Sequence, residues 1–269
     1  GSVNYPNHSD MEIDDIMNQF MGIQQYIKME TLPYDGIHHI DMHMKLLNEE
    51  TLLVAEYPEG VADGPQIEEN IQYILDNFTT PYGNSYNIVR IPSPPSTSGL
   101  YPDNNGYYRT YTNSVFINSK VLVPFYRTEY DTIAQRIYEE ALPGYEIIGI
   151  DCDNTPNNII SASGAIHCIT KAVGVDDPLL INHSPMKSSS YSPSVQFEAS
   201  AQHRYGIESM ELFYKIDGGN YTSILMNNIQ DNNYSCEVNG IPTNTEIEYY
   251  FKAISSSGKV INRPIVAPQ

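Results

Sequence analysis

The segment His38-His39-Ile40-Asp41-Met42-His43-Met44-Lys45 alternates polar and apolar residues and opens the unit that decides the fold. Alternation of this kind predicts a β-strand, in which successive side chains point to opposite faces of the sheet. On such a strand His39, Asp41 and His43 would share one face. The sequence therefore predicts imidazole and carboxylate groups that project together.

A hairpin, a helix and a further strand follow, and the same order returns later in the chain. The first strand, over 38–46, is expected to turn at 47–50 into a second strand over 51–56. Apolar residues at helical spacing predict a helix over 65–78, and a third strand is expected over 87–91. The order recurs after about seventy residues, which is typical of an array of supersecondary units. The second copy is predicted over 109–117, 120–123, 129–142 and 145–150.

Two further regions flank these units. Near the N-terminus an amphipathic helix is expected over 12–21 and a short strand over 24–29. After the second unit, a stretch rich in Ser and Pro over 177–194 predicts a connector. Many short strands with regular turns then predict a small β-sandwich of the immunoglobulin or fibronectin type. Its strands are expected at 194–200, 209–216, 222–226, 234–238 and 247–254.

The composition is that of a soluble globular protein with an acidic surface. The chain has 269 residues, 41% of them hydrophobic, and its 33 acidic and 14 basic residues give a formal charge of −19. Such a surface repels nucleic acid and anionic lipid, because phosphate binding needs clustered Lys and Arg. It would attract cationic substrates, although solubility is the interpretation that we prefer. No stretch approaches the roughly 18 apolar residues of a membrane span, and no signal peptide is visible.

The number and spacing of the cysteines argue against a disulfide framework. Three cysteines cannot all pair, and Cys168 does not lie in a CxxC motif. A thiol, together with the imidazole of His39 and the carboxylate of Asp41, is the residue set for cysteine attack on a carbon–nitrogen bond. The other two cysteines are Cys152 and Cys236.

Each of these residues also has a simpler interpretation. A single histidine is often structural, and a lone cysteine is more often a small buried apolar residue than a nucleophile. His167, beside Cys168, would point away from it on a strand. His39, Asp41 and His43 could instead hold zinc or another metal, although one strand seldom supplies every ligand.

Three segments together resemble the bacterial peptidylarginine deiminase and agmatine deiminase family of guanidino-group-modifying enzymes. They are Gly36 to Met42, Thr112-Asn113-Ser114 with the later Val121-Leu122-Val123-Pro124, and Gly164 to Thr170. The string Gly164-Ala165-Ile166-His167-Cys168 is the most specific of them and is similar to the nucleophile motif of this family. The resemblance implies an α/β fold, a propeller of ββαβ modules. The expected domains are a partial propeller over 1–183, a linker over 184–194 and an Ig-like sandwich over 195–269.

The resemblance implies deimination of a guanidinium group. Cys168, as the thiolate, would attack the guanidinium carbon and form a covalent thiouronium intermediate. His39 would give a proton to the departing ammonia and then activate water, and Asp41 would grip the guanidinium nitrogens. Asn113 is expected to contact substrate as a nearby polar group. No metal or organic cofactor is required.

The implied substrate is an arginine-containing peptide or protein, or a small guanidino compound such as agmatine. The sandwich is similar to domains that follow the catalytic region in secreted bacterial members of the family. This likeness favours a secreted, periplasmic or cell-surface enzyme. Neither a nucleic-acid partner nor a membrane span is expected.

The chain departs from the family in one respect. Members use a second acidic residue from an early module, in a segment rich in Trp, and this chain has no Trp. We therefore expect a partial propeller whose N-terminal modules are missing, and a polypeptide that is inactive or very weakly active alone. The alternative is a non-catalytic, shortened homologue that acts as a binding or adhesion module through the sandwich.

Overall fold

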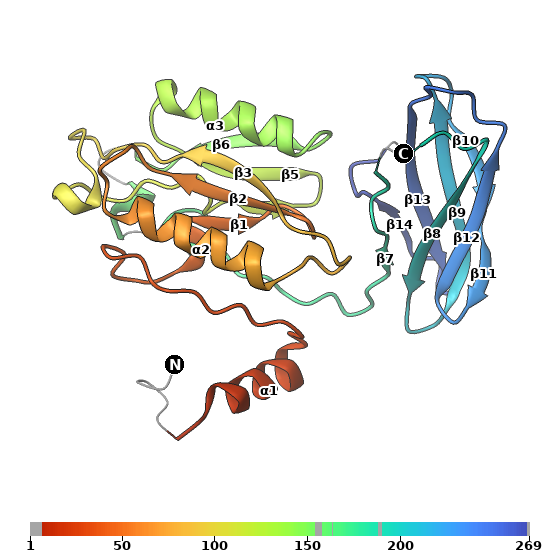
Figure 1. The fold of residues 1–269 in the computed structure, drawn as a ribbon, viewed down its shortest axis with the longest axis horizontal. Helices are drawn as coiled ribbons and strands as arrows, with labels where there is room; N and C mark the ends of the chain where they lie inside the picture. Colours follow the sequence, from red (N-terminus) through yellow and green to blue (C-terminus); the bar gives the residue numbers. More distant parts are fainter. Residues whose placement is uncertain (1–6, 154–157, 163, 188–189, 268–269) are drawn as a thin grey trace. The chain divides into compact units, whose positions relative to one another are not determined.

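The computed structural model describes residues 7–153, 158–162, 164–187 and 190–267. The chain divides into two compact units, one ending at Thr112 and the other beginning at Asn113. Figure 1 colours the helices and strands by their position along the sequence. Within the described ranges, none of the helices combines the length and the apolar character needed to cross a lipid bilayer.

The first helix confirms the amphipathic helix expected near the N-terminus. α1 (Asp10–Met21) begins after Ser9, whose hydroxyl accepts a hydrogen bond from the Glu12 backbone while the Glu12 carboxylate accepts one from the Ser9 backbone. It ends at Gly22, which adopts the left-handed conformation that commonly closes a helix. The strand expected over 24–29 is wrong, because these residues lie in irregular backbone and pair with no strand among the described residues.

The first ββαβ module is formed, with a shorter first strand than expected. β1 (Met44–Leu46) pairs antiparallel with β2 (Thr51–Glu56), and β2 pairs in parallel with β3 (Asn87–Pro92). α2 (Asp63–Asn77) joins β2 to β3 and packs against β2 (Figure 1). The core of the module consists of Leu32, Met44, Leu52, Val54, Ala55, Ile67, Ile71 and Ile74.

The prediction of one strand across the first histidines is wrong. Residues Ile40–Met42 form a short 3-10 helix, η1, and His38 just before it lies in the left-handed region at φ 54°. Left-handed backbone interrupts an extended strand. Side chains on a 3-10 turn do not alternate between two faces, so His39, Asp41 and His43 do not share one strand face.

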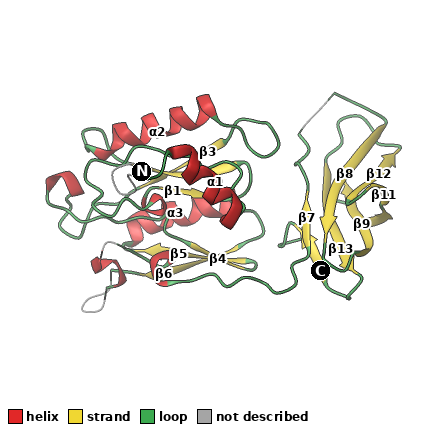
Figure 2. Cartoon of the chain, turned by 90° about the horizontal axis from the view of Figure 1, so that it is seen from below, coloured by secondary structure: helices red, strands yellow, loops and turns green. Residues whose placement is uncertain are grey.

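The same order of elements returns in the second unit. β4 (Val115–Ile117) pairs antiparallel with β5 (Lys120–Phe125), and β5 pairs in parallel with β6 (Glu146–Asp151). α3 (Thr128–Ala141) packs against β5 and β6, and Figure 2 shows these strands side by side. The ββαβ repeat is thus confirmed, although residues 109–114, expected to be strand, form none.

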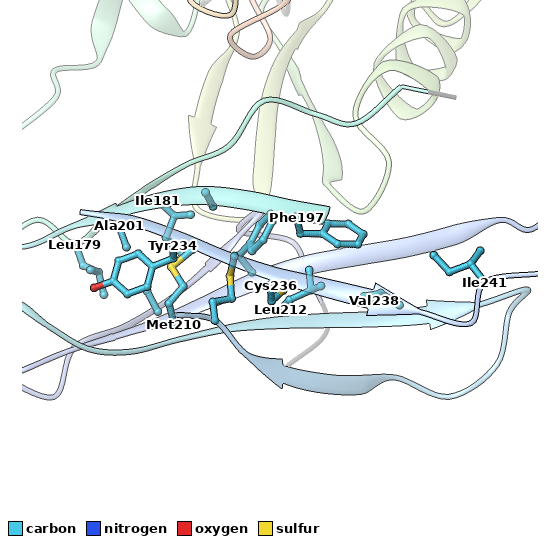
Figure 3. Packing of buried hydrophobic residues seen from close by; sticks show 14 residues of the cluster. Leu179, Ile181, Phe197, Ala201, Met210, Leu212, Tyr234, Cys236, Val238 and Ile241 are labelled. Carbon is cyan, nitrogen blue, oxygen red and sulfur yellow. The ribbon is translucent and has the colours of Figure 1, made fainter. Parts of the chain in front are cut away.

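The remaining strands form two four-stranded sheets, in the orders β10-β9-β13-β14 and β11-β12-β8-β7, with antiparallel neighbours throughout. Side chains from both sheets share one hydrophobic core, which Figure 3 shows around Phe197, Leu212 and Cys236. The bounds of the strands are β7 Leu180–Asn182, β8 Ser194–Gln202, β9 Ile207–Ile216, β10 Thr222–Leu225, β11 Asn227–Gln230, β12 Asn233–Asn239, β13 Ile247–Ser255 and β14 Val260–Arg263. Short 3-10 turns elsewhere are η2 Pro102–Asn104, η3 Ile159–Ala162 and η4 His167–Ile169.

The five strands expected in this region are confirmed, and β7, β11 and β14 are additions that the sequence pattern did not predict. β7 pairs with β8 although it lies before the predicted linker of 184–194. The chain therefore has a mixed α/β fold with several sheets. The Ig-like assignment, the domain boundaries and the propeller stay predictions.

Candidate active site

Cys168 lies on a short helical turn and is exposed to solvent. The turn is η4, so the prediction that His167 and Cys168 alternate along a strand is wrong. Gly164 lies directly against this turn. A Cβ atom at residue 164 would lie 2.8 Å from Cβ and 2.9 Å from Sγ of Cys168, closer than such atoms approach in proteins. Glycine at 164 is therefore what lets the thiol occupy its position.

Asn113 holds the same turn and the thiol together. Its side chain is fully buried, and its Nδ2 donates to Sγ of Cys168 at 3.1 Å. Its Oδ1 accepts from the backbone N–H groups of Ala165 at 3.1 Å and of His167 at 2.9 Å. One amide side chain thus fixes the backbone of the cysteine turn and presents a hydrogen-bond donor to the sulfur.

The other two cysteines lie in environments that suppress reactivity. Burial raises the pKa of the Cys152 thiol to about 11, and the neighbouring Asp151 carboxylate adds to the effect. Burial likewise raises the pKa of the Cys236 thiol to about 11, and Figure 3 shows this side chain inside the core of the two sheets. The thiolate is the nucleophilic form of cysteine, so both are unreactive near neutral pH. Cys168 is the exposed cysteine of the three.

In the first unit, His39 and Asp41 lie at the 3-10 turn η1. His39 is exposed and precedes the turn, while Asp41 is half-buried within it. The backbone oxygen of Asp41 accepts a hydrogen bond from Oγ1 of Thr112 at 2.8 Å, across 71 residues of sequence. Thr112 is fully buried, and its hydroxyl also lies 2.8 Å from that of Thr110. The backbone at Asp41 is therefore held in place by a threonine that is distant in the sequence.

His43 has a different environment from His39. It is buried, and burial lowers the pKa of its imidazole to about 4, against a smaller opposing effect of Asp35 and Asp41. Its Nδ1 has no hydrogen-bond partner within the part of the chain that the structure describes. The imidazole is therefore neutral and belongs to the interior. The three-residue metal face proposed from strand alternation does not form, because His43 is buried and no strand spans the three residues.

The structure gives several residues more specific positions than the sequence did. Asn113, expected as a polar group near substrate, contacts the sulfur of Cys168. Gly164 and Thr112 were quoted only as members of motifs, and their contacts were not foreseen. The available signal was the polar run 110–114 beside a strand, but burial of polar side chains depends on tertiary contacts that a local pattern does not contain.

These features define a mixed α/β protein of repeated ββαβ modules that carries an exposed cysteine held by a buried asparagine. A family model described as Porphyromonas-type peptidyl-arginine deiminase matches residues 3–173, which is more than half of the chain. The chain belongs to that family. The resemblance stated from its motifs is thereby confirmed.

Two curated relatives give the extent of the match. A Legionella pneumophila (strain Paris) protein named "Putative agmatine deiminase" is 23% identical over 170 residues, covering 62% of this chain and 47% of that protein. A Shewanella baltica (strain OS223) protein of the same name is 22% identical over 189 residues, covering 62% and 49%. This chain thus spans about half the length of the curated relatives it matches.

Among solved structures, the one titled "Putative Arginine Deiminase" from Porphyromonas gingivalis is similar, with a TM-score of 0.51 and 24% identity. The match covers 61% of this chain and 47% of that one. At this identity the likeness establishes the fold alone. The mixed α/β fold expected for the family is therefore confirmed.

The contact at Gly164 gives a first prediction. Gly164→Ala is expected to displace the Cys168 turn. The displacement should lower the alkylation rate of the Cys168 thiol by about tenfold or more. The overpacking should lower the free energy of unfolding by about 1–3 kcal/mol. The matched control is Gly174→Ala, because a Cβ there would meet no atom within 4 Å. Alkylation rates from intact-protein mass spectrometry, together with urea unfolding, check the prediction. Equal rates in the two variants would contradict it.

Proposed function

We propose that this chain carries catalytic groups of a guanidino hydrolase, with Cys168 as nucleophile, His39 as general acid and base, and Asp41 as a carboxylate that binds the guanidinium. Membership of the peptidyl-arginine deiminase family supports the reaction class. The single observation that supports Cys168 most directly is its exposure beside the Asn113 amide, at 3.1 Å from Nδ2 to Sγ.

The proposed chemistry has two halves. The Cys168 thiolate forms a carbon–sulfur bond to the guanidinium carbon, and a carbon–nitrogen bond then breaks as His39 gives a proton to the departing ammonia. The product of this half is a thiouronium bound to the enzyme. Water, deprotonated by His39, then attacks the same carbon, and the carbon–sulfur bond breaks to return the thiolate. The net change is replacement of one guanidinium nitrogen by oxygen, with release of ammonia.

Recognition of the cation is the role proposed for Asp41. A carboxylate binds a guanidinium through charge-assisted hydrogen bonds that fix its orientation. The acidic surface of the chain, with its formal charge of −19, raises the local concentration of a cationic substrate. The substrate class is an arginine-containing peptide or protein, or a small guanidino compound. A secreted, periplasmic or cell-surface location and weak activity of this polypeptide alone stay predictions.

Labelling with 2-chloroacetamidine tests the proposal without relying on turnover. This reagent carries an amidinium that imitates guanidinium and a carbon that alkylates a thiolate. We expect a single addition at Cys168, saturable with reagent concentration and slowed by agmatine or an arginine peptide. The neutral isostere 2-chloroacetamide is the matched control and should react at least about tenfold more slowly, because it lacks the charge that a carboxylate binds.

Two outcomes of the same labelling assay would contradict the proposal. Labelling at Cys152 or Cys236 would move the nucleophile, although the raised pKa of both thiols argues against it. Equal rates with the charged and neutral reagents would remove the evidence for a guanidinium site. That result would favour the non-catalytic alternative, in which the chain acts through its β-sheet region.

A further inference from the structure

Asp63 is a buried carboxylate to which the proposed reaction assigns no role. It is the first residue of α2, and its side chain is almost completely buried, at 1% exposure. Its Oδ1 accepts a hydrogen bond from the backbone N–H of Tyr34 at 2.9 Å. Its Oδ2 accepts one from the hydroxyl of Tyr108. Both carboxylate oxygens are therefore used, and their donors lie far apart in the sequence.

The first donor, the Tyr34 amide, begins the segment that contains the proposed general base His39. Residues 34–41 lead from Tyr34 to His39 and Asp41, and they lie outside regular helix and strand until η1 begins at Ile40. Within this segment, Oδ1 of Asp35 accepts from the N–H of Ile37 at 3.0 Å. Irregular backbone of this kind depends on contacts with other segments for a fixed position.

The second donor, the Tyr108 hydroxyl, begins a segment that ends at a hydrogen bond to Asp41. Residues 108–112 lead from Tyr108 to Thr112, whose Oγ1 donates to the backbone oxygen of Asp41 at 2.8 Å. The two segments are thus linked at one end by Asp63 and at the other end by Thr112. Asp63, Tyr108 and Thr112 are all buried. The residue that follows Thr112 is Asn113, which holds the Cys168 turn.

A carboxylate suits this linking position for physical reasons. It accepts two hydrogen bonds at once, and bonds to a charged acceptor are shorter and stronger than those to a neutral one. The start of a helix favours negative charge through the helix dipole. Burial and the Asp63 carboxylate together raise the pKa of Tyr108 well above its ordinary value, so its hydroxyl stays a donor.

We propose that Asp63 is a positioning residue for the deimination reaction, acting by holding residues 34–41 against residues 108–112 so that His39 and Asp41 keep their places. The inference rests on the proposed function of those two residues. Asp63 itself is proposed to contact no substrate. Its effect passes through the Tyr34 amide and the Tyr108 hydroxyl.

Two variants separate positioning from folding. Asp63→Asn keeps an acceptor for the Tyr34 amide but replaces Oδ2 with a donor, whereas Tyr108→Phe removes only the hydroxyl and is the milder change. Each should lower the second-order rate of 2-chloroacetamidine labelling at Cys168 by about tenfold, because small displacements of binding groups carry large kinetic costs. The 2-chloroacetamide rate, which needs no carboxylate, should stay unchanged.

The matched control is Asp103→Asn, since Asp103 accepts from the Ala62 amide beside Asp63 and, among the described residues, forms no hydrogen bond or ion pair with residues 34–41. Hydrogen exchange supplies a second readout that does not depend on the reaction. In both variants the loss of the hydrogen bond between Tyr108 and residue 63 should loosen residues 34–41, so that the Ile37 amide exchanges faster while the amides of β2 keep their protection.

The outcomes are distinguishable. If the wild type shows no preference for the charged reagent, the proposed function fails, and the positioning role fails with it. If the wild type shows the preference and both variants keep it, the positioning role alone is overturned. Faster exchange without slower labelling would make Asp63 a purely structural residue, and slower labelling without faster exchange would overturn the route through residues 34–41.

Discussion

Asn113→Asp is expected to slow alkylation of Cys168 near pH 7 by more than tenfold while leaving the chain folded. The substitution is almost isosteric. It keeps an oxygen that accepts from the amides of Ala165 and His167, so the backbone turn retains its bonds. It replaces the Nδ2 donor, 3.1 Å from the sulfur, with a carboxylate oxygen.

The size of the effect follows from charge. A negative group beside a second negative group disfavours the ionised form of both, and a shift equivalent to 1.36 kcal/mol changes the thiolate population tenfold. The variant should therefore need a higher pH to reach the same rate. Asn113→Ala is expected to behave differently, because it leaves the buried Ala165 amide without this acceptor, whereas the His167 amide still reaches the Asn113 backbone oxygen at 3.3 Å. A buried amide left unsatisfied costs about 1–3 kcal/mol.

A pH series of iodoacetamide labelling, followed by mass spectrometry, measures the first effect, and urea unfolding measures the second. For Asn113→Asp the rate profile should move to higher pH with an unchanged unfolding midpoint. For Asn113→Ala the midpoint should fall. A rate profile of Asn113→Asp that overlays the wild type would mean that the amide does not act on the sulfur.

The ββαβ repeat could be predicted because its signals are local. Apolar residues at helical spacing in α2 and α3, and short apolar strands around them, carry the information within each segment. The first strand could not be predicted in the same way. His38 adopts a left-handed conformation, and the alternation of polar and apolar residues after it is satisfied by a 3-10 turn instead. In a short segment, alternation of polar and apolar residues does not distinguish a β-strand from a 3-10 turn.

For the candidate site, the sequence indicated the residue types but not the contacts that hold them. The residue types of Cys168, His39 and Asp41 indicated a chemistry, and the motifs indicated a family, which the family model confirms. The contacts that hold these residues were not predictable. Asp63 and Thr112 act across 29 to 71 residues of sequence, and their burial as polar side chains is decided by partners that no local segment contains.

The second large effect concerns the buried His43 and acid stability. The pKa of its imidazole is lowered from 6.5 to about 4 by burial. Between these values the unfolded chain binds a proton that the folded chain does not, so the free energy of unfolding falls as the pH falls. The stability that depends on a neutral His43 is fully present above about pH 6.5 and is lost by about pH 4. A shift of this size corresponds to about 3 kcal/mol, a large share of the roughly 5–15 kcal/mol that stabilises a domain.

His43→Gln removes the titration and should flatten this part of the pH dependence. His8→Gln is the matched control, since it makes the same substitution at an exposed histidine. The local measurement is hydrogen exchange in β2, where the Ala55 amide donates to the His43 carbonyl oxygen at 2.8 Å. Protection of this amide in the wild type should fall steeply between about pH 6.5 and pH 4, after correction for the intrinsic exchange rate. Parallel slopes in the wild type and His43→Gln would show that carboxylates, and not this histidine, set the acid stability of the first unit.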